Sequence, residues 1–256
     1  MSSSFDLTTS LLASSFRGWR GTAAFKPQTR QPDKLLELYE IEASPYCRLV
    51  REVLTEMDLD VMIYPCPKNG TRFRPKAEAL GGKQQFPFLV DPNTGAQMYE
   101  SSDIISYLRR EYGNGQPAPR GFARGIGLTG SYLATATRII GRIRGAIARP
   151  SRAPDQPLEL YSFEASPYSR PVRELMCELE LPYRLRNFAK SCWQEMGPPQ
   201  VRKRFFPEAP LTGPNRIRML ELTGRMQVPY LVDPNTGAAM YESGEIMRYL
   251  VRTYGL

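Results

Sequence analysis

The chain has 256 residues, a net charge of +8 and no histidine. The absence of histidine excludes Ser–His and Cys–His nucleophile pairs, imidazole acid–base catalysis and most zinc sites, and we predict no metal site. No apolar run reaches the ~20 residues of a membrane-spanning helix. The cysteines are widely spaced without a CxxC pair, which favours a reducing compartment, the cytoplasm or alternatively the plastid stroma.

Two phrases occur twice in the chain. The phrase EASPYCR at 42–48 returns as EASPYSR at 164–170. The phrase FPFLVDPNTGAQMYES at 86–101 returns as VPYLVDPNTGAAMYES at 228–243. A repeat of this length is too long for a solenoid unit and indicates a duplicated domain.

The duplication divides the chain into four segments. Residues 1–33 form an N-terminal helix and linker, and residues 34–113 form copy one. Residues 114–156 form a basic helix and linker, and residues 157–256 form copy two. Copy two contains an insertion near 191–210, rich in Pro, Arg and Lys, which we expect to be a surface loop or lid.

Residues 1–30 contain Ser, Thr and Arg and few acids, which resembles a transit peptide. The same helical spacing of apolar residues occurs near 130–147, however, and an internal segment cannot be a targeting signal. We therefore interpret 6–20 as a structural amphipathic helix and keep the transit peptide as the alternative. We expect the apolar sides of the two helices to fill the seam between the copies, with the isoleucines at 139–147 in this core. Contact of these isoleucines with a membrane is the alternative.

Both copies have the predicted element order β-α-β-α-β-β-α. In copy one the predicted strands are 35–41, 61–64, 86–90 and 96–99, the helices are 47–57 and 103–112, and 68–79 is a loop or short helix. In copy two the same elements are predicted at 158–163, 168–179, 183–188, 214–222, 228–232, 238–241 and 244–254. This order predicts an α/β fold with a mixed four-stranded sheet in each copy and a right-handed crossover.

This element order, the Ser-Pro-Tyr-Cys at the first helix and the later Phe-Pro and Glu-Ser pairs resemble the N-terminal, thioredoxin-like domain of glutathione S-transferases and their glutaredoxin relatives. The resemblance covers most of each copy and implies two tandem thioredoxin-like domains. It also implies glutathione as co-substrate. The implied activity is that of a glutathione transferase or thiol transferase, with a small electrophile, a disulfide or a protein thiol as the second substrate.

The resemblance assigns roles to individual residues. Ser44 matches the serine that donates a hydrogen bond to the glutathione thiolate at a helix N-terminus, where backbone N–H groups stabilise an anion. Cys47 matches the second cysteine of the glutaredoxin pair and is either a redox thiol or a buried core residue. Pro87 and Pro229 match a proline that is cis in the family. The glutathione-binding residues would be Gln85, Phe86, Pro87, Glu100 and Ser101 in copy one, and Ser166, Gln227, Val228, Pro229, Glu242 and Ser243 in copy two.

Glutathione transferases follow this domain with a helical domain that holds the electrophile, and we find no such domain here. The electrophile site therefore has to come from the preceding helices, copy two, the insertion or another chain. The alternative function is a non-catalytic adaptor, because residues 120–152 carry seven arginines and no acid and suit an anionic membrane surface or a protein complex. We expect no nucleic-acid partner, because that stretch has few aromatics for base stacking, and we leave oligomerisation open.

Overall fold

The computed structural model describes the chain except for residues 1–3, 26–30, 114–120, 140–143, 197–203 and 206–211, and except for the side chains of 121–124 and 139. In copy one the elements are β1 (Leu36–Glu40), α2 (Pro45–Glu56), β2 (Val61–Pro65), α3 (Arg74–Gly81), β3 (Phe88–Asp91), β4 (Ala96–Tyr99) and α4 (Ser101–Glu111). In copy two they are β5 (Leu158–Ser162), α6 (Arg170–Glu178), β6 (Tyr183–Asn187), α8 (Pro214–Thr223), β7 (Tyr230–Asp233), β8 (Ala238–Tyr241) and α9 (Ser243–Tyr254). Every predicted strand and helix of the two copies is confirmed, and 68–79 contains the start of a helix. Most of the predicted insertion lies outside the described residues, and its described part includes a short 3-10 turn at Trp193–Glu195.

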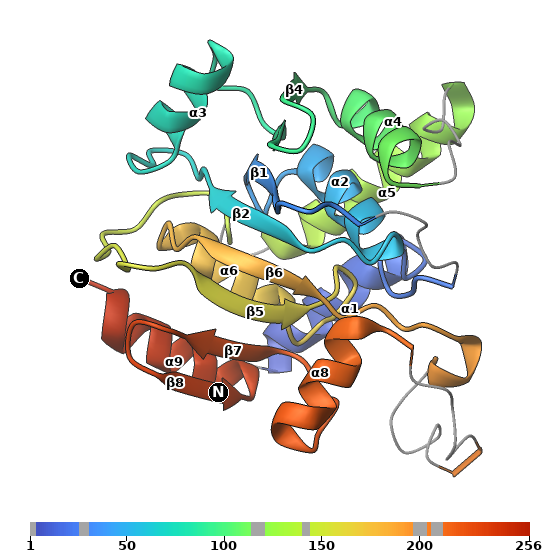
Figure 1. Ribbon diagram of the computed structural model, residues 1–256, viewed down its shortest axis with the longest axis vertical. Helices are drawn as coiled ribbons and strands as arrows, with labels where there is room; N and C mark the ends of the chain where they lie inside the picture. Colours follow the sequence, from blue (N-terminus) through green and yellow to red (C-terminus); the bar gives the residue numbers. More distant parts are fainter. Residues whose placement is uncertain (1–3, 26–30, 114–120, 140–143, 197–203, 206–211) are drawn as a thin grey trace.

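The two four-stranded halves join into one sheet with the strand order β4-β3-β1-β2-β6-β5-β7-β8 (Figure 1). The junction is an antiparallel pair of β2 and β6, with Val61 opposite Leu185 and Ile63 opposite Tyr183. Within each copy the first two strands are parallel and the last two are antiparallel to their neighbours. Pairing β2 with β6 satisfies backbone groups that an isolated copy would expose along a sheet edge.

One hydrophobic core runs under both halves of the sheet on the face covered by α2, α4, α6 and α9. Leu38 and Val50 of copy one and Leu160 and Val172 of copy two belong to the same buried cluster. The opposite face carries two smaller clusters, one around Phe88 below α3 and one in copy two below α8. The two copies therefore share a core as well as a sheet.

The repeated DPNTG turn holds the β3–β4 hairpin to α4. The carboxylate of Asp91 accepts hydrogen bonds from Tyr107 and Tyr112, both at 2.6 Å, and from the backbone N–H of Asn93 at 2.8 Å. Burial acts to raise the pKa of Asp91, but these hydrogen bonds lower it below its ordinary value. The repeated turn is thus explained by folding alone.

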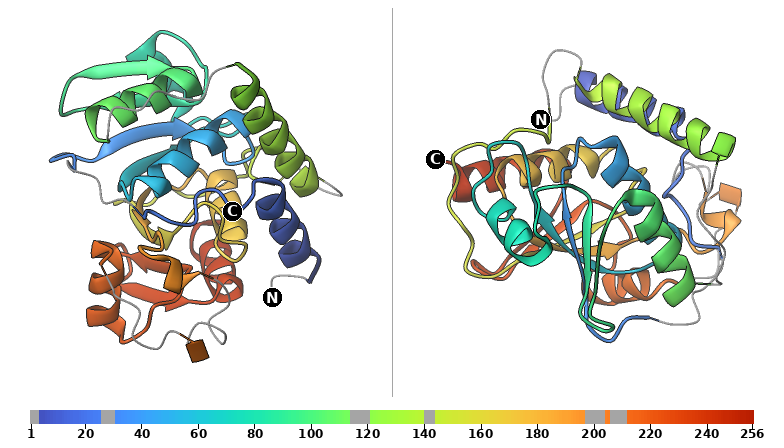
Figure 2. Two further views of the ribbon diagram at one scale, coloured as in Figure 1. Left: turned by 90° about the vertical axis from the view of Figure 1, so that its right-hand side faces the viewer. Right: turned by 90° about the horizontal axis from the view of Figure 1, so that it is seen from above.

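Helices α1 (Ser4–Phe16) and α5 (Gly121–Ile139) lie side by side and antiparallel, outside the helical layer of the sheet (Figure 2). Arg17, just after α1, donates to the carbonyl of Gly127 near the start of α5, and Arg138 at the end of α5 donates to the carbonyl of Asp6. None of the helices in the described part of the chain combines the length and the hydropathy of a membrane span.

The expectation that the apolar sides of these helices fill the seam was wrong. Leu11, Leu12 and Phe16 are exposed, and the side of α1 that packs inward consists of small or hydroxyl residues. Ile147 is also exposed, while the other isoleucines of 139–147 lie outside the described side chains. The physical reason lies in two buried arginines that these helices cover, Arg48 and Arg170, which donate to hydroxyl groups of α5 and α1.

Candidate functional site

The predicted glutathione residues of copy one converge at one edge of the sheet. Tyr39 of β1 lies opposite Phe88 of β3, and Phe88 lies opposite Tyr99 of β4. The end of β1, the start of β3 and the end of β4 therefore lie together at one end of these strands. Ser44 follows β1, Phe86 precedes β3 and Glu100 follows β4 there. Copy two repeats this register through Tyr161, Tyr230 and Tyr241.

Ser44 occupies the N-cap of α2. Its Oγ accepts a hydrogen bond from the backbone N–H of Cys47 at 3.3 Å, while no described residue accepts the hydroxyl hydrogen. That hydrogen is free to be donated to an anion at the helix N-terminus. Ser166 makes the matching bond to the N–H of Ser169 at 3.2 Å, but it is only 1% exposed, whereas Ser44 is half-buried.

The loop before the third strand has the same geometry in both copies. The Phe86–Pro87 and Val228–Pro229 peptide bonds are both cis, as the resemblance implied. In copy one the guanidinium of Arg74 lies 5.0 Å from the centre of the Phe86 ring, a cation–π contact that brings a positive charge to this edge.

Glu100 and Ser101 lie at the start of α4, beside this loop. Gln85 donates from Nε2 to Glu100 Oε1, and in copy two Gln227 donates to Glu242 Oε1 at 2.7 Å. Glu100, with a φ of 63°, is the N-cap residue, and Ser101 is the first helical residue.

A left-handed φ at a residue other than glycine is strained, and both copies keep it, with Glu242 at 68°. The exposed Glu carboxylate and the backbone N–H groups of the helix start together form a place where an amino acid's ammonium and carboxylate can be held.

Cys47 lies in the core rather than at the site. Its side chain is fully buried, and burial, reinforced by the charge of Glu40, raises the pKa of the thiol to about 12. A thiol in this state is neutral at physiological pH and cannot act as an exposed nucleophile. Of the two roles expected for Cys47, the structure favours the buried core residue.

The helix that precedes the opposite copy stands beside each candidate site. The hydroxyl of Ser131 in α5 donates to the carbonyl of Pro45 at 2.7 Å, and the hydroxyl of Tyr132 donates to that of Tyr46 at 2.8 Å. On the other side, Ser14 of α1 donates to the carbonyl of Ala165 at 2.8 Å. Helix α5 thus packs against the two residues that follow Ser44.

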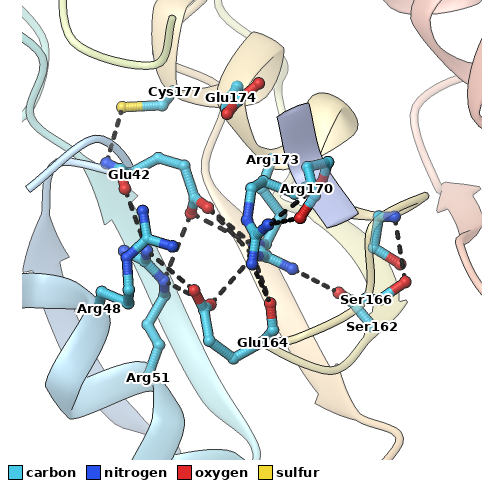
Figure 3. Close-up of polar contacts among 12 residues, drawn as sticks. Glu42, Arg48, Arg51, Ser162, Glu164, Ser166, Arg170, Arg173, Glu174 and Cys177 are labelled. Atoms are coloured by element: carbon cyan, nitrogen blue, oxygen red, sulfur yellow. Dashed lines mark hydrogen bonds and ion pairs between the residues drawn. The ribbon is translucent and has the colours of Figure 1, made fainter. Parts of the chain in front are cut away.

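Buried charges join the two copies next to these serines. We call them the interface cluster; each is at most 4% exposed, and most of them are labelled in Figure 3. The cluster consists of Glu40, Glu42, Arg48, Arg51, Glu164, Arg170 and Arg173.

Each central arginine of the interface cluster binds carboxylates from both copies. Arg51 Nε and Arg173 Nη2 donate to Glu164 Oε2 at 2.9 and 3.0 Å. Arg173 Nη2 also donates to Glu42 Oε1 at 3.1 Å, and Arg51 Nε lies 3.4 Å from Glu42 Oε2. The cluster therefore ties β1–α2 of one copy to β5–α6 of the other.

The protonation of the interface cluster is not symmetric. Burial acts to raise the pKa of Glu164, but Arg173, Arg51 and Arg48 hold it well below its usual range. Burial raises the pKa of Glu40 to about 7, because Arg51 only partly offsets the loss of hydration. Copy two has the neutral Ser162 in the place of Glu40.

The sequence-based reasoning missed the interface cluster. It assigned the repeated phrase EASPYCR to glutathione, whereas the glutamate and arginine that open and close this phrase, Glu42 and Arg48, belong to the junction between the copies. The available signal was the retention of both charges, as Glu164 and Arg170, on either side of the Ser-Pro-Tyr.

Two β-α-β-α-β-β-α units with a cis-proline before the third strand and polar residues at two helix starts define a tandem thioredoxin-like protein. Residues 38–117 and 160–256 match the family described as "Glutathione S-transferase, N-terminal domain". Since these stretches make up more than half of the chain, the chain belongs to this family, and each copy matches it separately.

Similar solved structures come from insect glutathione transferases. BmGSTD1 of Bombyx mori in complex with GTT is 27% identical over 33% of this chain and 39% of that chain, with a TM-score of 0.30. A delta-class enzyme of Nilaparvata lugens is 29% identical over 30% of this chain and 36% of that chain, with a TM-score of 0.25. The chain thus spans less than two fifths of either enzyme. The comparison with curated proteins gives no match.

Proposed function

We propose that copy one binds glutathione and serves as a serine-type, glutathione-dependent transferase. The observation that carries this proposal is the convergence of Ser44, the cis Phe86–Pro87 loop and the Gln85–Glu100 pair at one sheet edge. Glu100 would bind the γ-glutamyl ammonium, and Ser101 with the helix N–H groups would bind its carboxylate. Phe86 would pair with the tripeptide backbone.

In the proposed reaction Ser44 lowers the pKa of the bound thiol by donating its hydroxyl hydrogen to the sulfur. The thiol proton leaves to solvent, and the sulfur forms a bond with an electrophilic atom, from which a leaving group departs with its electron pair. When the electrophile is a disulfide, the same attack is a thiol transfer. The buried Cys47 takes no part in either case.

Helix α5 would supply the wall that faces the second substrate, because Tyr46 and Tyr132 lie beside Ser44 with exposed rings whose centres are 5.9 Å apart. Copy two is the weaker candidate for binding, since Ser166 is almost fully covered. All four cysteines are free thiols, which fits the proposed reducing compartment, cytoplasm or plastid stroma.

Calorimetric titration of reduced glutathione into the full chain tests the binding step, with Ser101→Ala and its counterpart Ser243→Ala as a matched pair. We expect one site that Ser101→Ala weakens and Ser243→Ala leaves unchanged. Absence of heat at millimolar glutathione would refute the proposal.

The catalytic step is tested by Ser44→Ala and Ser166→Ala against a panel of electrophiles and disulfides. We expect Ser44→Ala to lower turnover about a hundredfold or more, as for other preorganised anion donors, while the melting temperature stays close to that of the unmodified chain. Equal turnover in the two variants would show that Ser44 does not stabilise the thiolate.

A further inference from the structure

Helices α1 and α5 turn their large apolar residues away from the protein. We call these residues the outer face, and their exposed fractions range from 38% at Leu11 to 59% at Ile126. The outer face consists of Phe5, Leu11, Leu12 and Phe16 of α1, of Trp19 just after α1, and of Ile126 and Leu133 of α5. The inward sides instead carry Thr9, Ser10, Ala13 and Ser14 of α1 and Ser131, Ala134 and Thr135 of α5, all buried.

The interface cluster explains this orientation. Arg48 and Arg170 form no ion pair within the described residues, so they need neutral acceptors. Arg170 donates to Ser10 Oγ and Ser14 Oγ, both at 3.1 Å, and Arg48 donates to Thr135 Oγ1 at 3.4 Å. A buried guanidinium is costly without hydrogen-bond partners. The hydroxyl sides must therefore face inward, and the apolar sides are left to face outward.

The outer face is uncharged. The two helices lie side by side on one flank of the molecule in both views of Figure 2. Gly130 permits their close approach, because a Cβ there would lie 3.0 Å from the carbonyl oxygen of Phe16. Among the described side chains of α1 and α5, every exposed one is uncharged. Apolar patches of this kind mark an interaction surface on a soluble protein.

We infer that the outer face lies on an anionic membrane surface. Two helices in one plane, apolar on one side and polar on the other, suit the headgroup region, into which such helices sink by about 5–10 Å. Aromatic side chains such as Phe16 and Trp19 are favoured at this depth.

The positive charge of the chain favours an anionic membrane as the partner of the outer face. The chain carries a net charge of +8, and in the sequence Arg120 and Arg124 lie six and two residues before Ile126, in a stretch from 120 to 152 without an acid. Arg138, Arg144 and Arg149 of this stretch are already paired with Glu174, Asp6 and Glu178, so the attraction rests on the net charge and on the other arginines. An anionic bilayer attracts such a protein, whereas a second copy of the same chain would repel it. The inference does not depend on glutathione binding.

Trp19 offers a direct probe of this contact. The chain has two tryptophans, so the Trp193→Phe variant leaves Trp19 as the only one. This variant is mixed at low salt with vesicles of phosphatidylcholine alone, or of equal parts phosphatidylcholine and phosphatidylserine. We expect a blue shift of Trp19 emission and co-flotation with the mixed vesicles only, and a loss of binding as salt is raised past physiological strength.

Substitutions on the outer face locate the contact. Leu12→Glu and Leu133→Glu should each lower the vesicle partition coefficient about tenfold or more, because each removes an apolar side chain from the proposed membrane contact and adds a charge that the anionic surface repels. Leu222→Glu is the matched control, since Leu222 is an exposed leucine of α8 at 62%. Circular dichroism should show an unchanged fold for all three.

Other outcomes overturn the inference. Absence of binding to mixed vesicles at low salt does so, and so does binding that Leu12→Glu and Leu133→Glu leave unchanged. Light scattering of the same samples detects a self-associated chain; a dimer that these two variants dissociate, without vesicle binding, would assign the outer face to a second copy instead.

Discussion

Replacing Glu164 by glutamine tests whether the interface cluster holds the two copies together. The substitution keeps the size of the side chain and removes its charge. Glu164 Oε2 accepts from Arg51 at 2.9 Å and from Arg173 at 3.0 Å, and all three side chains are at most 3% exposed. The variant therefore leaves two buried arginines with one carboxylate fewer between them.

The expected loss is about 3–5 kcal/mol of unfolding free energy, the cost of removing one partner from a buried ion pair. An exposed pair is worth about 0–1 kcal/mol. The matched control is Glu245→Gln, because Glu245 pairs with Arg248 on α9 and both side chains are about 60% exposed. We expect that control to change the unfolding free energy by less than about 0.5 kcal/mol.

Urea denaturation followed by circular dichroism measures both variants. Because the copies share one sheet and one core, the unmodified chain should unfold in a single transition, and the midpoint of Glu164→Gln should fall without a change in slope. A loss below about 1 kcal/mol would refute the reasoning, since it would place Glu164 in the range of surface pairs.

The pH dependence gives a second check on Glu164. Its pKa is lower in the folded chain than the ordinary 4.5. Its contribution to stability is therefore complete above that value and disappears as the pH falls through the folded pKa. The difference in unfolding free energy between Glu164→Gln and the unmodified chain should accordingly shrink below pH 4.5.

Three further predictions concern Glu40, Gly21 and the cysteines. The pH dependence expected for Glu40 is opposite to that of Glu164. Because its pKa is raised to about 7 in the folded chain, its stabilising contribution is complete below pH 4.5 and is lost as the pH rises through 7. In urea titrations from pH 5 to pH 8, the unfolding free energy of Glu40→Gln should therefore rise by up to about 3 kcal/mol relative to that of the unmodified chain. A difference that stays constant over this range would contradict the prediction. Gly21→Ala should destabilise by about 1–3 kcal/mol more than Gly18→Ala in thermal unfolding. Both glycines have a positive φ, but only the new Cβ at Gly21 would meet a neighbour, Glu164 Cβ at 2.8 Å. A thiol reagent should modify the half-buried Cys192 first and the buried Cys47 only on unfolding, and fast labelling of Cys47 in the folded chain would be the contrary result.

The sequence by itself determined the duplication and the element order of each copy, and it predicted residues for the candidate site. These features rest on local patterns. Hydrophobic periodicity distinguishes strand from helix, and the matched phrases around Ser44, Pro87 and Glu100 pointed to one family before any contact was known. The structure brings these three positions to one sheet edge, because the strands that carry them are neighbours in register.

Tertiary structure alone decided how the copies meet. No local pattern specifies that β2 pairs with β6, because an edge strand offers the same backbone groups to any partner. The sharing of Glu164 by Arg51 of one copy and Arg173 of the other follows from that junction.

The orientation of α1 and α5 shows the limit of sequence patterns most clearly. Periodicity establishes that a helix has two unlike sides, but not which side meets the protein. Apolar residues such as Leu12 were expected to face inward, as in most soluble proteins. Here Arg48 and Arg170, which form no ion pair among the described residues, require the hydroxyl sides, because burying those charges without acceptors costs more than exposing the apolar residues.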